Sequence, residues 1–143
     1  MSTAVQILEG KEGKVLSIDA DATVYEAVER MVGANVGALL VEVDGSINGI
    51  FTERDYLRRV TLEGRTDKEC TVREIMTSPL LVVSPDTTVE ECMSLMTQRR
   101  IRHLPVAENG TVIGVISIGD VVKFNSKQQS YQLQYLNDYI SAR

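Results

Sequence analysis

Two short segments combine a hydroxyl side chain with a carboxylate three residues later. They are Thr52-Glu53-Arg54-Asp55 and Ser117-Ile118-Gly119-Asp120. Such a pair is typical of a helix start, where free backbone N–H groups and the helix dipole can receive an anion. Thr52 and Ser117 can donate hydrogen bonds to a phosphate, and Asp55 and Asp120 can accept them from ribose hydroxyls, as an acid does in dinucleotide folds. From spacing alone, simple capping of the helix is the favoured explanation.

Positive charge is concentrated in residues 98–103, Gln-Arg-Arg-Ile-Arg-His. Arginine binds phosphate through a bidentate fork, so Arg100 and Arg102 join Thr52, Arg54 and Ser117 as candidate phosphate ligands. The alternative is a solvated helix end, where basic residues favour the dipole. We expect Arg102 and His103 to face a ligand and Arg99 to face solvent. His103 is the sole histidine, and we assign it to the pocket wall.

An internal repeat must position these segments. A shift of 65 residues aligns residues 18–57 with 83–122 without a gap, and ten of the forty positions are identical, Asp55/Asp120 and Gly49/Gly114 among them. A repeat of this length is a whole supersecondary unit.

Each copy predicts the same order of elements, beginning with a helix. Residues 23–26 and 88–91 fit the Thr-x-x-Glu start of a helix. The apolar stripes that follow are Val24, Ala27, Val28 and Met31 in the first copy and Val89, Cys92, Met93 and Met96 in the second. Both are expected to be buried because they fall at helical spacing.

A hairpin follows each of these helices. Two β-rich runs, 38–43 and 47–52 or 104–106 and 112–117, flank Asp44-Gly45 or Asn109-Gly110, which are strong two-residue turn signals. Gly49 and Gly114 indicate a bulge or a close backbone approach. The last helix of the first copy is predicted to run through Leu62 and stop at Gly64.

The predicted fold class is α+β, of the α/β type, with two tandem β-α-β-β-α repeats packed sheet to sheet in pseudo-twofold symmetry. One copy of about 55–60 residues is marginal for a core, so the copies should stabilise each other. Repeat 1 is predicted over 3–64, repeat 2 over 71–124 and a C-terminal helix over 125–143, with 4–8 leading into the first repeat and 72–77 into the second. That helix is expected to have an apolar face, which could pack on its own domain, form a dimer contact or bind a partner protein. The residues of this face are Tyr131, Leu133, Tyr135, Leu136, Tyr139 and Ile140.

Composition bounds the function. The net charge of −5 over 143 residues argues against broad attachment to nucleic acid or to an anionic membrane. Since there is neither an apolar run of about 20 residues nor a signal peptide, we expect the cytoplasm. Cys70 and Cys92 form no CxxC pair, which favours neither disulfides nor zinc, and no metal site is predicted. The common catalytic and phosphate-loop motifs are absent, so no enzyme is predicted.

The motifs in tandem resemble a known family. They are Val-x-x-Ile-Met-Thr at 72–77, Arg-His-Leu-Pro-Val at 102–106, Gly-Ile-Phe-Thr-Glu-Arg-Asp at 49–55 and Gly-Val-Ile-Ser-Ile-Gly-Asp at 114–120. This arrangement resembles the paired cystathionine-β-synthase (CBS) domain, or Bateman module, over residues 3–124. The resemblance implies an adenosine-containing ligand, AMP before NAD(H), ATP or S-adenosylmethionine, in clefts between the copies. It also implies Asp55 and Asp120 at the ribose, a homodimer and a regulated partner protein.

The adenine would lie at the turn into the first hairpin strand of each copy. The candidate positions are Val36, Gly37, Ala38 and Leu39 in the first copy and Ile101, His103, Leu104 and Pro105 in the second. The copies differ there, because Gly37 stands opposite Arg102, and Arg54 stands opposite Gly119. We therefore expect the two clefts to bind unlike ligands or one of them to stay empty.

Two other functions remain open. One is a dimeric protein-interaction module without a ligand, in which Asp55 and Asp120 only cap helices. The other is nucleic-acid binding through residues 99–103, which would make association steeply salt-dependent.

Overall fold

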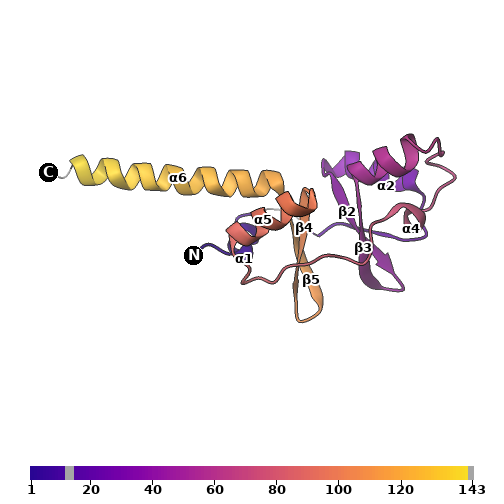
Figure 1. Ribbon diagram of the computed structural model, residues 1–143, viewed down its shortest axis with the longest axis horizontal. Helices are drawn as coiled ribbons and strands as arrows, with labels where there is room; N and C mark the ends of the chain where they lie inside the picture. Colours follow the sequence, from indigo (N-terminus) through magenta and orange to yellow (C-terminus); the bar gives the residue numbers. More distant parts are fainter. Residues whose placement is uncertain (12–14, 142–143) are drawn as a thin grey trace. The chain divides into compact units, whose positions relative to one another are not determined.

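The chain folds into two compact units that each hold one β-sheet. The computed structural model describes residues 1–11 and 15–141 (Figure 1). Unit 1 consists of residues 1–13 and 82–143, and unit 2 of residues 14–81. The mixed helix and strand fold with two tandem repeats is as predicted.

Unit 2 contains a three-stranded sheet. Its elements are β1 (Ser17–Asp19), α2 (Val24–Ala34), β2 (Ala38–Val43), β3 (Ser46–Thr52), α3 (Glu53–Tyr56), the π-helical turn η1 (Leu57–Thr61) and α4 (Val72–Ile75). The strand order is β1-β2-β3, in which β1 runs parallel and β3 antiparallel to β2. This is the predicted β-α-β-β-α order. The last helical segment ends at Thr61 and reaches a turn at Gly64, whose φ is +68°.

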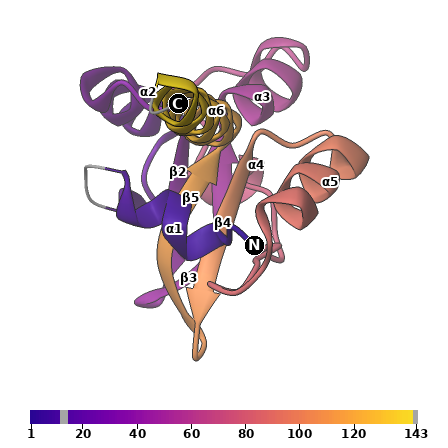
Figure 2. The same ribbon diagram turned by 90° about the vertical axis from the view of Figure 1, so that its left-hand side faces the viewer.

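Unit 1 contains a two-stranded sheet. Its elements are α1 (Ala4–Glu9), α5 (Val89–Arg99), β4 (His103–Glu108), β5 (Thr111–Ser117) and α6 (Ile118–Ser141). Figure 2 shows α1 lying over the β4–β5 hairpin. The strand that should open this repeat is reduced to one parallel bridge between Val83 and Val106.

Both hairpins have the predicted turn and the predicted irregularity. Asp44, Gly45, Asn109 and Gly110 all have positive φ, as the tight two-residue turn requires. The register shifts after Val41↔Gly49 and after Val106↔Gly114, which places a bulge next to each glycine.

Each glycine also lies against a second segment. A Cβ on Gly49 would stand 2.8 Å from Met76 Sδ and 3.0 Å from the Thr77 carbonyl oxygen. A Cβ on Gly114 would stand 2.7 Å from Leu8 Cδ2. A bulge and a close approach therefore coincide at both positions.

Each segment that touches one of these glycines packs in the unit formed by the other repeat, not the repeat that it precedes in the sequence. Residues 4–8 were expected to lead into the first repeat, but α1 packs in unit 1, where Ala4 and Ile7 are buried and the Ala4 N–H donates to the Thr87 carbonyl at 2.8 Å. Residues 72–77 were expected to lead into the second repeat, but α4 packs in unit 2, where Val72 and Ile75 are buried. Each unit thus completes its core with a segment from outside its own repeat.

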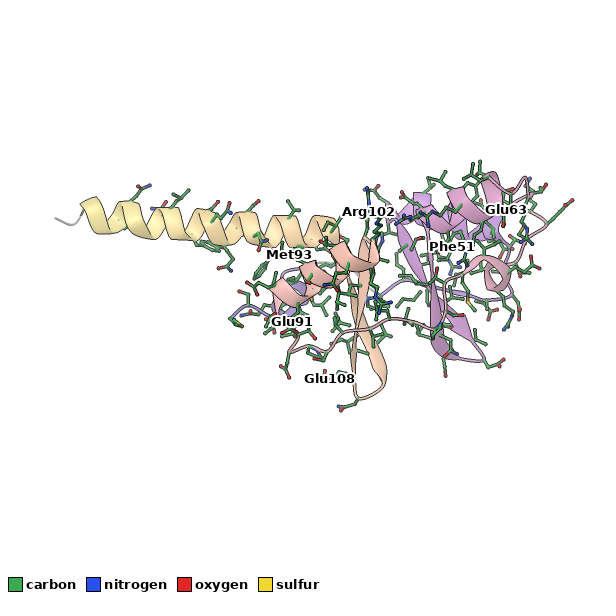
Figure 3. The ribbon with its side chains drawn as sticks, in the orientation of Figure 1. Phe51, Glu63, Glu91, Met93, Arg102 and Glu108 are labelled. Carbon is green, nitrogen blue, oxygen red and sulfur yellow. The ribbon has the colours of Figure 1, made fainter. Side chains whose placement is uncertain are left out.

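The two apolar stripes differ in how far they are buried. In α2, Val24, Ala27 and Met31 are buried and Val28 is half-buried. In α5, Met93 is 39% exposed, contrary to expectation. Met93 lies on α5 beside α6 (Figure 3), and its sulfur accepts a weak hydrogen bond from Asn125 Nδ2 at 3.7 Å. The stripe is correct in period, but α6 covers this position only in part.

The C-terminal helix begins earlier than expected. Instead of starting at residue 125, α6 runs without a break from Ile118, so the last helix of the repeat and the tail are one element. It extends beyond the rest of unit 1 (Figure 1). Tyr131 and Leu133 are 68% and 63% exposed, so neither packs back on its own unit. Tyr135, Leu136, Tyr139 and Ile140 lie outside the side chains that the structure describes. Among the described helices, none is long and apolar enough to cross a membrane.

Candidate functional site

Asp55 is held at the start of α3 in unit 2. Thr52 is the N-cap: its N–H donates to Asp55 Oδ2 at 3.0 Å, and its Oγ1 accepts from the Asp55 N–H at 3.2 Å. The Thr77 hydroxyl donates to Asp55 Oδ1 at 2.9 Å. Asp55 is the one buried charged residue in the described part of the chain, at 8% exposure. Its oxygens are aligned as hydrogen-bond acceptors, and they also complete a capping box.

Asp120 is held in the same way at the start of α6 in unit 1. The Ser117 N–H donates to Asp120 Oδ2 at 2.8 Å, and Ser117 Oγ accepts from the Asp120 N–H at 3.0 Å. Lys11 Nζ donates to the same Oδ2 at 2.8 Å. Burial raises the pKa of this carboxyl, but the hydrogen bonds from Lys11 and Ser117 outweigh burial and leave the pKa below its usual value. Asp120 is therefore a stable anion.

Backbone bonds tie each helix start to the turn before the first hairpin strand. In unit 2 the Glu53 N–H donates to the Gly37 carbonyl at 3.1 Å, and in unit 1 the Ile118 N–H donates to the Arg102 carbonyl at 2.9 Å. Ala38 pairs with Thr52 and His103 with Ser117 across the strands. The structure thus brings each predicted hydroxyl–acid pair together with the turn of its own repeat.

The predicted adenine positions divide into half-buried and buried ones. Val36, Gly37, Ala38, Ile101 and His103 are half-buried, so they can line a surface site. Leu39 and Leu104 are 1% and 0% exposed and belong to the cores, and Pro105 is buried too. The side chains of these three stabilise the sheets, and only their backbone can meet a ligand.

Unit 2 contains an apolar pocket of about 510 Å³ between α2 and the α3–η1 segment. It is lined by Val28, Met31, Val32, Asn35, Val36, Gly37, Glu53, Tyr56 and Leu57. Val36 and Gly37 are predicted adenine positions, whereas the α2 and η1 residues were not predicted. Periodicity indicated that one face of α2 is buried, but no sequence pattern indicated that η1 would leave a hollow beside it.

The candidate arginines all lie at the surface. Arg54, Arg100 and Arg102 are exposed, as is Arg99. Arg100 ends α5 in the left-handed conformation, with φ 54° and ψ 43°, which makes it part of the helix C-cap. Figure 3 shows Arg102 at the end of the β4–β5 hairpin opposite to Glu108. Its expected approach to a ligand remains a prediction. No group of three His, Cys, Asp or Glu residues able to hold a metal occurs among the described residues.

Two residues of the arrangement were missed. Thr77 was noted only as part of a motif, and Lys11 was not noted at all. Lys11 Nζ donates both to Asp120 and, at 2.7 Å, to the Val115 carbonyl. No local sequence pattern predicts this contact, because 109 positions separate Lys11 from Asp120.

Known proteins resemble this chain in sequence and in fold. The family model of the CBS domain matches residues 12–62 and 72–127. The mitochondrial CBS domain-containing protein CBSX3 of Arabidopsis thaliana is 46% identical over 134 residues, which cover 90% of this chain and 65% of that protein. A solved protein with CBS domains from Burkholderia ambifaria MC40-6 is 45% identical with a TM-score of 0.82, over 85% of this chain and 92% of that one. A hexameric CBS-CP12 protein from bloom-forming cyanobacteria is 35% identical with a TM-score of 0.76, over 85% and 70%.

Proposed function

This chain belongs to the CBS domain family, and from that premise we propose that it binds an adenosine-containing ligand and modulates a partner protein according to whether the ligand is bound. The observation that carries the proposal is the repeated arrangement of acid, hydroxyl and turn. In both units a Ser/Thr-x-x-Asp helix start is tied by a backbone hydrogen bond to the turn before the first hairpin strand. Capping alone requires no such turn beside it.

The chemistry around unit 2 suits a nucleoside monophosphate. Val36 and Gly37 offer a half-buried apolar edge to adenine, Asp55 an anionic acceptor to ribose hydroxyls, and Arg54 a cation for phosphate. Since Arg54 is the one cation of its helix start, a single phosphate is easier to neutralise than the two of NAD(H) or the three of ATP, and S-adenosylmethionine offers it no phosphate. We therefore place AMP before NAD(H), ATP and S-adenosylmethionine.

We propose binding rather than catalysis. A general base works best with a pKa near neutrality, whereas the hydrogen bonds from Lys11 and Ser117 lower the pKa of Asp120. A carboxylate with a lowered pKa accepts hydrogen bonds well and removes protons poorly. The homodimer and the cytoplasm stay predictions, and the name of the Arabidopsis relative assigns that protein to mitochondria.

A thermal-shift titration with AMP, ADP, ATP, NAD, NADH and S-adenosylmethionine tests the proposal. A ligand that binds only the folded state, at a concentration of 100 times its Kd, should raise the unfolding midpoint by about 5–10 °C. Asp55→Asn and Asp120→Asn should reduce the rise, because the charge of the acceptor is lost. Glu108→Gln is the matched control, since it removes a carboxylate charge at the exposed hairpin turn (Figure 3).

The alternative is an interaction module without a ligand. It is favoured by the hydrogen bonds that already engage both oxygens of Asp55 and by Val32 and Leu57 at the pocket, which are 76% and 56% exposed. If a folded, self-associated protein gives no shift with any of the six compounds, this alternative replaces the first proposal.

A further inference from the structure

Lys11 makes two specific contacts although its side chain is 37% exposed. Its ammonium lies between the Val115 carbonyl, at 2.7 Å, and Asp120 Oδ2, at 2.8 Å. Both partners flank the helix start of unit 1, one on β5 and one in the first turn of α6. Lys11 is the residue that brings positive charge onto the candidate ribose acceptor.

Unit 2 satisfies the equivalent groups without a charge. Ile50 and Asp55 occupy the repeat positions of Val115 and Asp120. The Thr77 N–H donates to the Ile50 carbonyl at 2.9 Å, and the Thr77 hydroxyl donates to Asp55 at 2.9 Å.

The segments that supply Thr77 and Lys11 also correspond. Met76 lies against Gly49 just as Leu8 lies against Gly114. The same strand carbonyl and the same carboxylate are thus held in both units, by a neutral residue fixed in a β-bridge in unit 2 and by a cation on a flexible stem in unit 1.

This difference has a consequence for a ligand. A ribose hydroxyl and the Lys11 ammonium both donate to the carboxylate. Because the ammonium neutralises the charge shared by the two oxygens, it competes with the ribose hydroxyl even where that hydroxyl approaches Oδ1. The ammonium is the stronger donor because it is charged, yet it can swing into solvent on its four-carbon stem. On Asp55 the competing donor is a neutral hydroxyl, which a ribose hydroxyl can replace like for like.

We propose that Lys11 is a built-in competitor for Asp120, which makes unit 1 the weaker of the two nucleotide positions. The inference rests on the proposed function. The lowered pKa of Asp120 supports it, because it reports the favourable pairing that a ligand must replace. A partly exposed ion pair of this kind weakens a competing ligand by about 2- to 5-fold.

Calorimetric titration with AMP tests the inference in the full chain. The Asp55→Asn background weakens the unit 2 position, so that the remaining binding reports unit 1. Adding Lys11→Met, which keeps the length of the stem and removes the charge, should tighten AMP binding about 2- to 5-fold. Lys11→Arg keeps the charge and should bind as the background does. Lys127→Met removes a lysine charge from an exposed position of the same unit and controls for the general effect on an anionic ligand.

The outcomes are distinct. Tighter binding in Lys11→Met alone supports the inference. Unchanged binding, or weaker binding that indicates a phosphate contact of Lys11, overturns it while the proposed function stands. Absence of AMP binding in the wild-type protein and in every variant overturns both. Circular dichroism confirms that each variant is folded, and Lys11→Gln replaces Lys11→Met if the latter unfolds.

Discussion

Asp55 and Asp120 occupy the same position in the two repeats but meet different partners. Asp55 receives hydrogen bonds from neutral groups of Thr52 and Thr77. Asp120 receives one from the Lys11 ammonium. Because only the second contact is an ion pair, the stability of unit 1 should depend on pH and salt through this carboxyl.

Acid should therefore destabilise unit 1 through Asp120. The pKa of its carboxyl in the folded protein lies below the usual value of 3.8, so the unfolded chain binds the proton more readily. The stabilisation is then fully present above pH 3.8 and is lost as the pH falls through the lower, folded pKa. Urea unfolding between pH 2.5 and 6 measures it.

The variants give the control for this pH dependence. Asp120→Asn and Lys11→Met should each flatten the acid limb of the stability curve, because one removes the titrating group and the other removes the main partner that lowers its pKa. Equal slopes in the wild-type protein and in both variants would show that other groups dominate the acid response.

The sequence predicts these acids and their caps but not their partners. The spacing of Thr52 to Asp55 and of Ser117 to Asp120 is local, and a helix start forms from neighbours along the chain. The Lys11 contact depends on how a distant segment packs. The turn signals placed Leu39, Leu104 and Pro105 beside a ligand, but they did not show that three consecutive residues of β2 and of β4 would be buried.

The β-hairpins each depend on a glycine that carries two functions. Gly49 and Gly114 lie beside a bulge in β3 and β5, and each also admits a second segment against the strand. Both glycines must leave room for a second segment, but the atoms that approach the two glycines differ. Gly49 meets the Met76 side chain and a backbone carbonyl oxygen, whereas the three atoms nearest to a Cβ on Gly114 all belong to the Leu8 side chain.

Substitution by alanine should separate the two hairpins. Gly49→Ala should cost about 1–3 kcal/mol, because its Cβ would stand 3.0 Å from the Thr77 carbonyl oxygen, which the bridge to Ile50 holds in place. Gly114→Ala should cost less, since Leu8 can change rotamer. Chemical denaturation of both variants measures the difference. A larger loss for Gly114→Ala would contradict this account.

Elements formed by local pattern were predicted closely, and those that depend on neighbours were not. The hairpins follow from Asp44-Gly45 and Asn109-Gly110, whose positive φ is intrinsic to these residue types. Met93 has helical spacing, yet it is exposed because burial depends on what covers α5. Val83 forms only a single bridge, and nothing in its sequence distinguishes it from Ile18, which lies within β1.

The repeats and the compact units of the molecule have different boundaries. The family model follows the repeats, at 12–62 and 72–127, whereas unit 2 spans residues 14–81 and unit 1 includes residues 1–13. Duplication along the chain is visible as identity at a fixed offset. Which short segment fills which core is decided by packing, and the order of residues 4–8 and 72–77 along the chain does not reveal it.

A fragment should fold when its ends match a compact unit and not when they match a repeat. Residues 14–81 contain the whole core of unit 2, while residues 1–66 lack Val72 and Ile75, both 0% exposed. Losing two such side chains removes about 3–6 kcal/mol, comparable to the entire stability of a small domain. Circular dichroism and amide-proton exchange should show structure in 14–81 and little in 1–66. Equal protection in the two fragments would contradict the assignment of α4 to unit 2.

The position of α1 also sets the order in which the chain can assemble during translation. Residues 3–11 leave the ribosome before everything they pack against in unit 1, because β5 and the start of α6 emerge some hundred residues later. At a usual rate of about 5–20 residues per second, that delay is roughly ten seconds. Until the rest of the unit 1 core has emerged, Ile7 and Leu8 lack part of their native contacts and are available to chaperones. Unit 2, by contrast, can close as soon as residue 81 has emerged.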